Sequence, residues 1–204
     1  MQSNVNRSAV KRLFAGTLIA TIGFAAAAPT AQSVSTRQAT ERVRTALERL
    51  PRYGVFDFVG FELDRGSVTL VGYAYHGHLK SDAGKAVSRL DGIEEVGNHI
   101  EVLPASQNDD RIRWATFYNI YTDTFLSRYA PGGASSAYQD VLRFRRFPGL
   151  QPFGDYPIHI VVNRGRTTLY GIVDSESDKM IAGVRAREIP GVFGVENQLV
   201  VDEE

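Results

Sequence analysis

The sequence of 204 residues contains no cysteine. This absence excludes disulfide bonds, thiolate metal ligands and a cysteine nucleophile. It also excludes a bacterial lipoprotein, which needs a cysteine to carry its lipid. An excess of charge is lacking as well, because Lys plus Arg and Asp plus Glu both total 23. A balanced chain has no general attraction to nucleic acid, so we expect no nucleic-acid partner, and electrostatic binding must come from a local patch.

Long apolar runs are also lacking. The longest, Leu13–Ala28, has 16 residues, fewer than the ~20 that cross a bilayer. It follows a basic leader and precedes polar sequence, which is the pattern of a cleavable signal peptide over residues 1–31, cut between Ala27 and Ala31. An uncleaved membrane anchor is the alternative. Cleavage would remove three basic residues and no acidic one, leaving a net charge of about −3. We expect a periplasmic chain that is soluble or peripheral.

Catalytic and metal-binding motifs are scarce. His76 and His78 lack a third clustered ligand, so ordinary surface histidines are expected there rather than a metal site. Asp109 and Asp110 precede a predicted helix and are expected to cap its N-terminus. No phosphate-binding loop and no serine nucleophile turn is recognisable. We therefore expect neither an enzyme nor a bound cofactor.

The sequence repeats itself after 99 residues. Without a gap, Phe61–Val102 aligns with Ile160–Val201, and 12 of the 42 positions are identical. An ungapped match of this length predicts two copies of one structural unit. The identities include Arg65/Arg164, Gly66/Gly165, Leu70/Leu169, Gly72/Gly171, Lys80/Lys179, Gly92/Gly191, Val96/Val195 and Asn98/Asn197.

Each copy predicts a β-hairpin, then a helix, then a last strand. The tight turns are expected at 64–66 and 163–165, where glycine supplies a positive φ. Gly72 and Gly171 fall inside the second strand, where glycine marks a bulge or a close neighbour. A strand, helix, strand sequence favours parallel pairing of the two strands.

A further helix precedes the first hairpin, from a capping box at Ser35 and Gln38 to Pro51. In the second copy, Ser175 and Asp178 form a similar box before the later helix. The predicted fold class is α+β, with two tandem α-β-β-α-β modules, each a three-stranded mixed sheet with two helices. The modules are expected at 35–104 and 111–202, joined by a linker at 105–110.

The repeated motif resembles the BON domain of bacterial envelope proteins. It stands as Gly66, Val68-Thr69-Leu70, Gly72, Gly92-Ile93, Val96, Asn98, Ile100 and Val102, and again as Gly165, Thr167-Thr168-Leu169, Gly171, Gly191-Val192, Val195, Asn197, Leu199 and Val201. The resemblance implies the same α-β-β-α-β architecture, a periplasmic location, a role in envelope integrity or osmotic stress, and phospholipid binding in several members. It implies no catalytic residues.

The second copy departs from this pattern in two places. An insertion at about 128–155 contains Pro, Gly and Ser as loops do, and loops of this length are usually functional or disordered. The helix before it carries an aromatic stripe and a second apolar face. The candidate binding residues are Trp114, Phe117, Tyr118, Tyr121, Phe125, Arg143, Phe144, Arg145 and Arg146.

Two interpretations of these residues stay open. They are either core and interdomain contacts, or a surface for anionic phospholipid, since Trp and Tyr suit the headgroup region and arginines attract its charge. The corresponding functions are phospholipid binding at a membrane face, or a protein-binding, chaperone-like module that holds other envelope proteins through exposed aromatics and sheet edges.

Overall fold

The computed structural model describes residues 31–146, 151–152 and 156–202, so residues 1–30 of the predicted signal peptide lie outside it. The side chains of residues 31–35 and 144–146 lie outside it too. Contacts divide the chain into two compact units, and each is described here by itself. The first holds residues up to Pro51, Val59–Gly72 and His78–Glu101, and the second holds Arg52–Phe58, Tyr73–Gly77 and the chain from Val102 onward.

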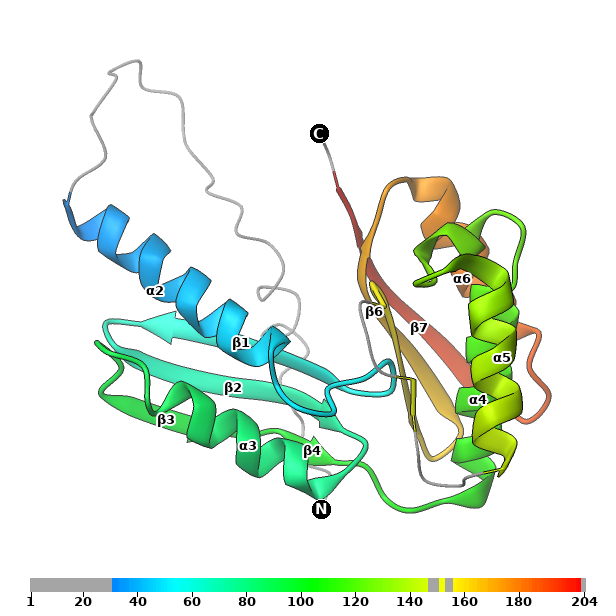
Figure 1. Ribbon diagram of the computed structural model, residues 1–204, viewed down its shortest axis with the longest axis horizontal. Coiled ribbons are helices and arrows are strands. Elements are labelled where there is room, and N and C mark those ends of the chain that lie inside the picture. Colours follow the sequence, from blue (N-terminus) through cyan, green and yellow to red (C-terminus); the bar gives the residue numbers. More distant parts are fainter. Residues whose placement is uncertain (1–30, 147–150, 153–155, 203–204) are drawn as a thin grey trace. The chain divides into compact units, whose positions relative to one another are not determined.

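The first unit follows the predicted α-β-β-α-β order (Figure 1). Its elements are α2 (Ala31–Glu48), β1 (Phe58–Asp64), β2 (Ser67–Ala74), α3 (Gly77–Val87), β3 (Glu95–Asn98) and β4 (Glu101–Val102). The sheet has the order β1-β2-β3, and the short β4 also pairs with β2. The predicted parallel pairing of β2 and β3 is confirmed. Each helix buries apolar residues four apart, Val43 and Leu47 on α2 and Leu79 and Ala83 on α3, which is the spacing of one helix face.

The second unit repeats this plan with additional helical structure. Its elements are α4 (Gln107–Tyr121), the 3-10 helix η1 (Leu126–Tyr129), α5 (Gly133–Arg146), β5 (Ile158–Asn163), β6 (Arg166–Val173), α6 (Glu176–Arg187) and β7 (Gly194–Val201). The sheet order is β5-β6-β7, antiparallel and then parallel. Helices α4, α5 and α6 lie on one side of this sheet (Figure 1). The two units confirm the predicted α+β class with tandem modules.

The predicted glycine positions have the expected geometry. In both hairpin turns, an arginine and a glycine occupy positive φ, at 46° and 87° for Arg65 and Gly66 and at 52° and 74° for Arg164 and Gly165. Gly171 has φ 127°. A Cβ atom there would lie 1.7 Å from the carbonyl oxygen of Pro157. The close neighbour that the sequence predicted at Gly171 is therefore present.

The repeated asparagine fastens helix to strand in both units. The Asn98 side chain donates from Nδ2 to the carbonyl oxygen of Lys80 at 2.7 Å and accepts from the backbone N–H of Ile100 at 3.3 Å. The Asn197 side chain makes the equivalent bonds in the second unit, at 2.6 and 3.3 Å. The helix must lack a Cβ opposite this amide: one at Gly183 would lie 2.9 Å from Asn197 Nδ2. The asparagine is therefore the same in both copies because its side chain links and packs against the helix.

Two helix starts differ from the sequence interpretation. Helix α2 begins at Ala31, so Ser35 lies inside it and is not an N-cap. Helix α4 begins at Gln107 and is capped by Ser106, whose Oγ accepts from the backbone N–H of Asp109. The prediction that Asp109 and Asp110 cap this helix is wrong. The Asp109 carboxylate accepts from the backbone N–H groups of Arg164 and Gly165, both at 2.8 Å, and Asp110 pairs with Arg113. By contrast, Ser175 caps α6 as predicted.

The described part of the predicted insertion contains a helix, α5, where its composition favours a loop. Gly132 and Gly133, at φ 82° and 74°, allow a sharp turn that few other residues adopt, and α5 follows at once. Its Ala137 is fully buried and Val141, one turn later, packs against the same core. The apolar face of α5 therefore packs on α4 and η1, which gives the second apolar face of α4 its partner.

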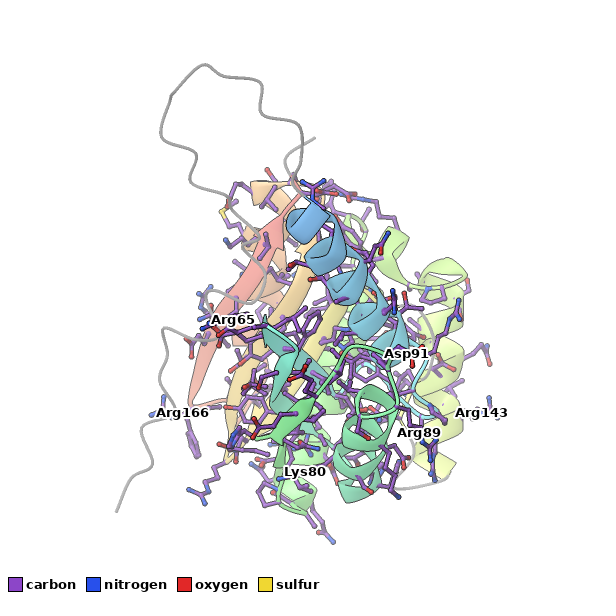
Figure 2. All side chains as sticks on the ribbon, turned by 90° about the vertical axis from the view of Figure 1, so that its left-hand side faces the viewer. Arg65, Lys80, Arg89, Asp91, Arg143 and Arg166 are labelled. Carbon is purple, nitrogen blue, oxygen red and sulfur yellow. The ribbon has the colours of Figure 1, made fainter. Side chains whose placement is uncertain are left out.

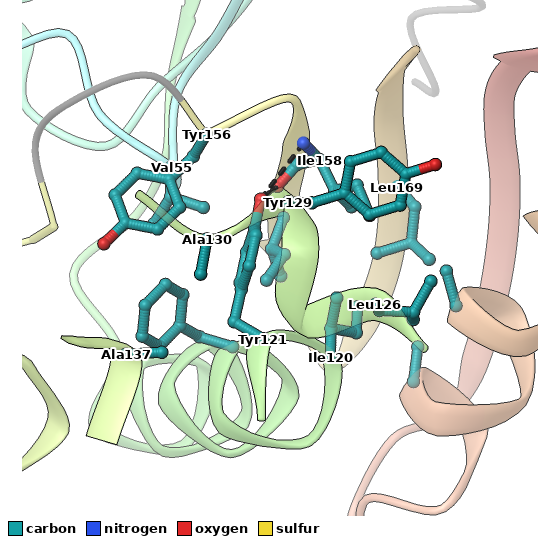
Figure 3. Packing of buried hydrophobic residues seen from close by; sticks show 14 of the residues in the cluster. Val55, Ile120, Tyr121, Leu126, Tyr129, Ala130, Ala137, Tyr156, Ile158 and Leu169 are labelled. Atoms are coloured by element: carbon teal, nitrogen blue, oxygen red, sulfur yellow. Dashed lines mark hydrogen bonds between the residues drawn. The ribbon is translucent and has the colours of Figure 1, made fainter. Parts of the chain in front are cut away.

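The core of the second unit also contains residues that come from before the first hairpin. Val55 and Phe56 are fully buried in the core cluster of this unit. Figure 3 shows Val55 among the other residues of the cluster. The carbonyl oxygen of Val55 accepts from the backbone N–H of Ile160 at 2.8 Å, on β5. The segment Arg52–Phe58 thus completes this unit by backbone pairing as well as by packing. No helix in the described part of the chain is long and apolar enough to cross a membrane.

Candidate functional site

The structure separates the candidate aromatic residues into a buried and an exposed group. Phe117 and Tyr121 are fully buried, and Trp114 is half-buried. Trp114 meets Phe56 edge-on at 4.9 Å and Phe117 at 5.6 Å between ring centroids. Phe117 and Tyr121 belong to the core, and the partly buried Trp114 packs against it.

Tyr121 also has a polar function inside this core. Its hydroxyl donates to the carbonyl oxygen of Ile158 at 2.7 Å and accepts from the backbone N–H of the same residue at 3.0 Å (Figure 3). The buried backbone N–H and carbonyl groups at the start of β5 thus both form hydrogen bonds with a side chain. Tyr121 is a structural residue that fixes where β5 begins against α4.

The exposed candidates are Tyr118 and Phe125. Tyr118, on α4, is 40% exposed and lies 6.4 Å from the ring centroid of Tyr138 on α5. Tyr138 is 46% exposed, and Leu142, one turn later on α5, is 43% exposed. Arg143 is exposed and points away from α5 (Figure 2). We call Tyr118, Tyr138 and Leu142 the tyrosine face, and the helical spacing puts Arg143 at its edge.

The remaining candidates do not join this face in the same way. Phe125 is 62% exposed, but α4 ends at Tyr121, so the predicted continuation of the aromatic stripe along one helix is wrong. The Asp123 carboxylate stops the helix because it accepts from the backbone N–H groups of Phe125 and Leu126 at 2.8 and 3.2 Å. Three other candidates, Phe144, Arg145 and Arg146, have side chains outside the described part of the structure.

Asp123 is held by charge as well as by backbone groups. Arg185 donates to its Oδ2 from Nε at 2.8 Å and bridges to Glu188. Burial alone would raise the pKa of Asp123, but the hydrogen bonds from Phe125 and Arg185 outweigh it and lower that pKa. These residues border an open polar hollow of about 270 Å³, lined by Asn119, Thr122, Asp123, Thr124, Arg185 and Glu188. Because its charges pair with one another, the hollow has a structural explanation.

A second charged cluster fastens η1 to α6. Arg128 donates to Asp178 at 2.5 Å and to Asp174 at 3.2 Å. The Tyr129 hydroxyl donates to Asp178 and accepts from the backbone N–H of Asp174. Burial, together with these carboxylates, raises the pKa of Tyr129 to about 12. No group of three metal-ligating side chains occurs among the described residues.

Several exposed apolar residues were not among the sequence candidates. Met180 is 64% exposed and Val184 44%, one turn apart on α6. Phe193 is 76% exposed, between α6 and β7. The alignment of the two copies could have identified Phe193, because the aligned residue in the first copy is Glu94. An exposed phenylalanine thus stands where the first copy has a charged residue.

Comparisons with known proteins bear on these surfaces. The sequence model of the BON domain matches residues 35–104 and 146–203. No curated protein matches the chain. Among solved structures, the C-terminal domain of CdsD, a structural protein of the type III secretion system of Chlamydia trachomatis, is 13% identical, with 80% of this chain and 96% of that chain covered and a TM-score of 0.26. A second CdsD structure is 12% identical, with 81% and 94% covered and a TM-score of 0.26. At these TM-scores the likeness carries no argument.

Proposed function

Because the chain belongs to the BON domain family, we propose that it is a non-enzymatic, periplasmic envelope protein whose second unit binds phospholipid at a membrane face. Family members are in general non-catalytic and are associated with phospholipid and the cell envelope. A function in envelope integrity or osmotic stress is part of the proposal. The signal-peptide pattern of residues 1–31 supports the periplasmic location.

The observation that carries this proposal is the tyrosine face. Two half-exposed tyrosines and a half-exposed leucine lie on neighbouring helices, and Arg143 follows Leu142 directly. A tyrosine has an apolar ring and a polar hydroxyl, which suits the boundary between headgroups and acyl chains. An arginine beside it contributes on the order of 1 kcal/mol of attraction to an anionic surface. The face thus has the chemistry of an interfacial contact.

Vesicle flotation tests the proposal directly. Residues 32–204 are expected to float with phosphatidylglycerol vesicles at low salt and to detach as salt screens the charge. The double variant Tyr138→Ser, Arg143→Ala is expected to bind at least about five-fold more weakly, because it removes one interfacial ring and one cation. Both side chains are exposed, so the melting temperature should be unchanged.

The matched control is Gln139→Ala, an exposed position on the same helix. It should bind as the parent chain does. Failure of the parent chain to float with anionic vesicles at low salt would refute phospholipid binding by this protein. Equal binding by the double variant would instead remove the tyrosine face from the contact.

A protein-binding function remains the alternative, and the exposed pair Met180 and Val184 on α6 favours it, because an apolar i, i+4 pair suits a groove on a partner. Suppression of aggregation of an unfolded envelope protein, by a chain that does not float with vesicles, would establish it. A Met180→Ser, Val184→Ser variant should then lose that suppression.

A further inference from the structure

One end of the second unit presents a phenylalanine among arginines. We call Arg111, Arg164, Arg166 and Phe193 the phenylalanine tip. The Phe193 ring lies against the hairpin turn: a Cβ at Gly165 would be 2.6 Å from Phe193 Cδ2. The backbone N–H of Phe193 donates to the carbonyl oxygen of Gly165 at 2.8 Å. The ring is therefore held on a fixed backbone while 76% of the residue stays exposed.

The arginines come from three elements and meet at this end. Arg111, the fifth residue of α4, donates to the carbonyl oxygen of Pro190 at 3.1 Å and to Asn108 Oδ1 at 3.0 Å. Arg164 lies in the turn, and Arg166 begins β6, with its Nη1 3.4 Å from where a Cβ of Gly194 would stand. Arg164 and Arg166 are exposed, and Arg166 lies outside the ribbon in Figure 2. Within the described residues, neither guanidinium forms an ion pair.

The carboxylates of Asp109 and Asp110, beside the tip, bind other groups of the second unit. Asp109 is 2% exposed and accepts from the backbone N–H groups of Arg164 and Gly165. Asp110 binds the buried Arg113 at 2.5 Å. Asp110 stays 39% exposed but is paired with Arg113. The tip itself presents one aromatic ring and three cations, which makes it complementary to an apolar surface with anionic groups at its edge.

The first repeat supplies an internal comparison. Its aligned positions 64, 65, 67, 91, 94 and 95 are Asp, Arg, Ser, Asp, Glu and Glu. In the second repeat, positions 163, 164, 166, 190, 193 and 194 are Asn, Arg, Arg, Pro, Phe and Gly. All four acidic residues at these positions of the first repeat are thus aligned with uncharged residues in the second, and one of them, Glu94, is aligned with Phe193. The same backbone therefore carries an acidic end in one copy and a basic, aromatic end in the other.

We propose that the phenylalanine tip is a second membrane contact, in which Phe193 enters the headgroup region and the three arginines select anionic phospholipid. This proposal rests on the proposed function only because the chain must meet a membrane. The residues of the phenylalanine tip are distinct from those of the tyrosine face. Apolar insertion supplies part of the affinity, and the cations supply the preference for anionic lipid.

A tryptophan placed at the tip reports insertion directly. In Phe193→Trp, the added fluorescence is expected to shift to the blue and to be quenched by brominated lipids in phosphatidylglycerol vesicles, and not in phosphatidylcholine vesicles. The parent chain, with Trp114 alone, gives the background. Phe193→Glu, which installs the residue of the first repeat, is expected to lower the affinity for anionic vesicles about ten-fold, and Arg164→Asn about five-fold.

Arg65→Asn is the matched control, because Arg65 is exposed at the same turn position with φ 46°. It should bind as the parent does. If the parent chain floats but the tryptophan of Phe193→Trp is not quenched, the phenylalanine tip is not a membrane contact. The same conclusion follows if Phe193→Glu binds anionic vesicles as tightly as the parent chain. Equal losses in Arg65→Asn and Arg164→Asn also overturn it, because general charge would then explain binding. If Phe193→Glu changes self-association but not vesicle binding, the tip contacts a second copy of the chain and not a membrane. A parent chain that binds no vesicles overturns the proposed function itself.

Discussion

Replacing Gly171 by alanine is expected to destabilise the second unit by more than about 4 kcal/mol, in the range reserved for severe steric or buried defects. Two independent costs add at this position. The φ of 127° is one that side-chain-bearing residues rarely adopt, and the new Cβ would stand 1.7 Å from the carbonyl oxygen of Pro157. That oxygen is backbone and accepts from the backbone N–H of Ile172, so it cannot move without displacing the start of β5.

The matched control is Gly133→Ala. Gly133 also has a positive φ, 74°, but nothing lies within 4 Å of its added Cβ. It should cost only about 1–2 kcal/mol of backbone strain. Urea unfolding followed by the fluorescence of Trp114, which is the single tryptophan and packs on Phe56 in the second unit, measures both. A similar loss in the two variants would mean that the contact with Pro157 is relieved cheaply.

The sequence predicted the parts of the fold that local chemistry and repetition determine. The turn glycines, the Ser175 cap and the parallel strand pairs were all predicted, because each depends on residues close in the chain or on the pattern shared by the two copies. The identity of Asn98 and Asn197 was visible too. Their use as a link between helix and strand was not, because the link needs the partner carbonyl 18 residues away.

The candidate site was predicted less well, for a physical reason. Periodicity shows that α4 has two apolar faces, but it does not show what covers them. The cover is α5, which follows Pro131 and Gly132 and begins with Gly and Ser residues, all of which favour a loop. Without that helix, the buried Phe117 and the exposed Tyr118 were indistinguishable. The end of α4 was also missed, because the Asp123 cap is stabilised by Arg185, 62 residues later.

Asp57→Ala is expected to destabilise the second unit by at least about 3 kcal/mol, since two buried donors and one partly buried donor lose their acceptor and each costs about 1–3 kcal/mol. The donors are the backbone N–H groups of Gly54 and Tyr75, at 3.0 and 2.6 Å, and Nε2 of Gln151 at 2.5 Å. The carboxylate is 1% exposed. It therefore joins three separate segments of the second unit from its interior. Asp140→Ala, which removes one hydrogen bond to Tyr156, should cost far less.

The same carboxylate gives the stability a defined pH dependence. Burial raises the pKa of Asp57 above its ordinary 3.8, even though the hydrogen bonds from Tyr75 and Gln151 oppose the rise. The folded chain therefore binds more protons than the unfolded chain as pH rises from 3.8 to the raised value, so the contribution of Asp57 to stability falls across that window.

Asp57→Asn cannot titrate, and its loss of stability relative to the parent should shrink as pH rises from 3.8 through the raised pKa of Asp57, because ionisation weakens the parent alone. Asp123 and Asp178, whose pKa values are lowered against the effect of burial by their hydrogen bonds, act in the opposite direction, because their contributions are lost as pH falls. Both titrate equally in parent and variant, so they cancel in the difference.

Urea unfolding of the two proteins across this pH range measures the difference in their stability. A difference that stays constant or grows with pH would mean that the three hydrogen bonds outweigh burial, and that Asp57 is held as a carboxylate throughout.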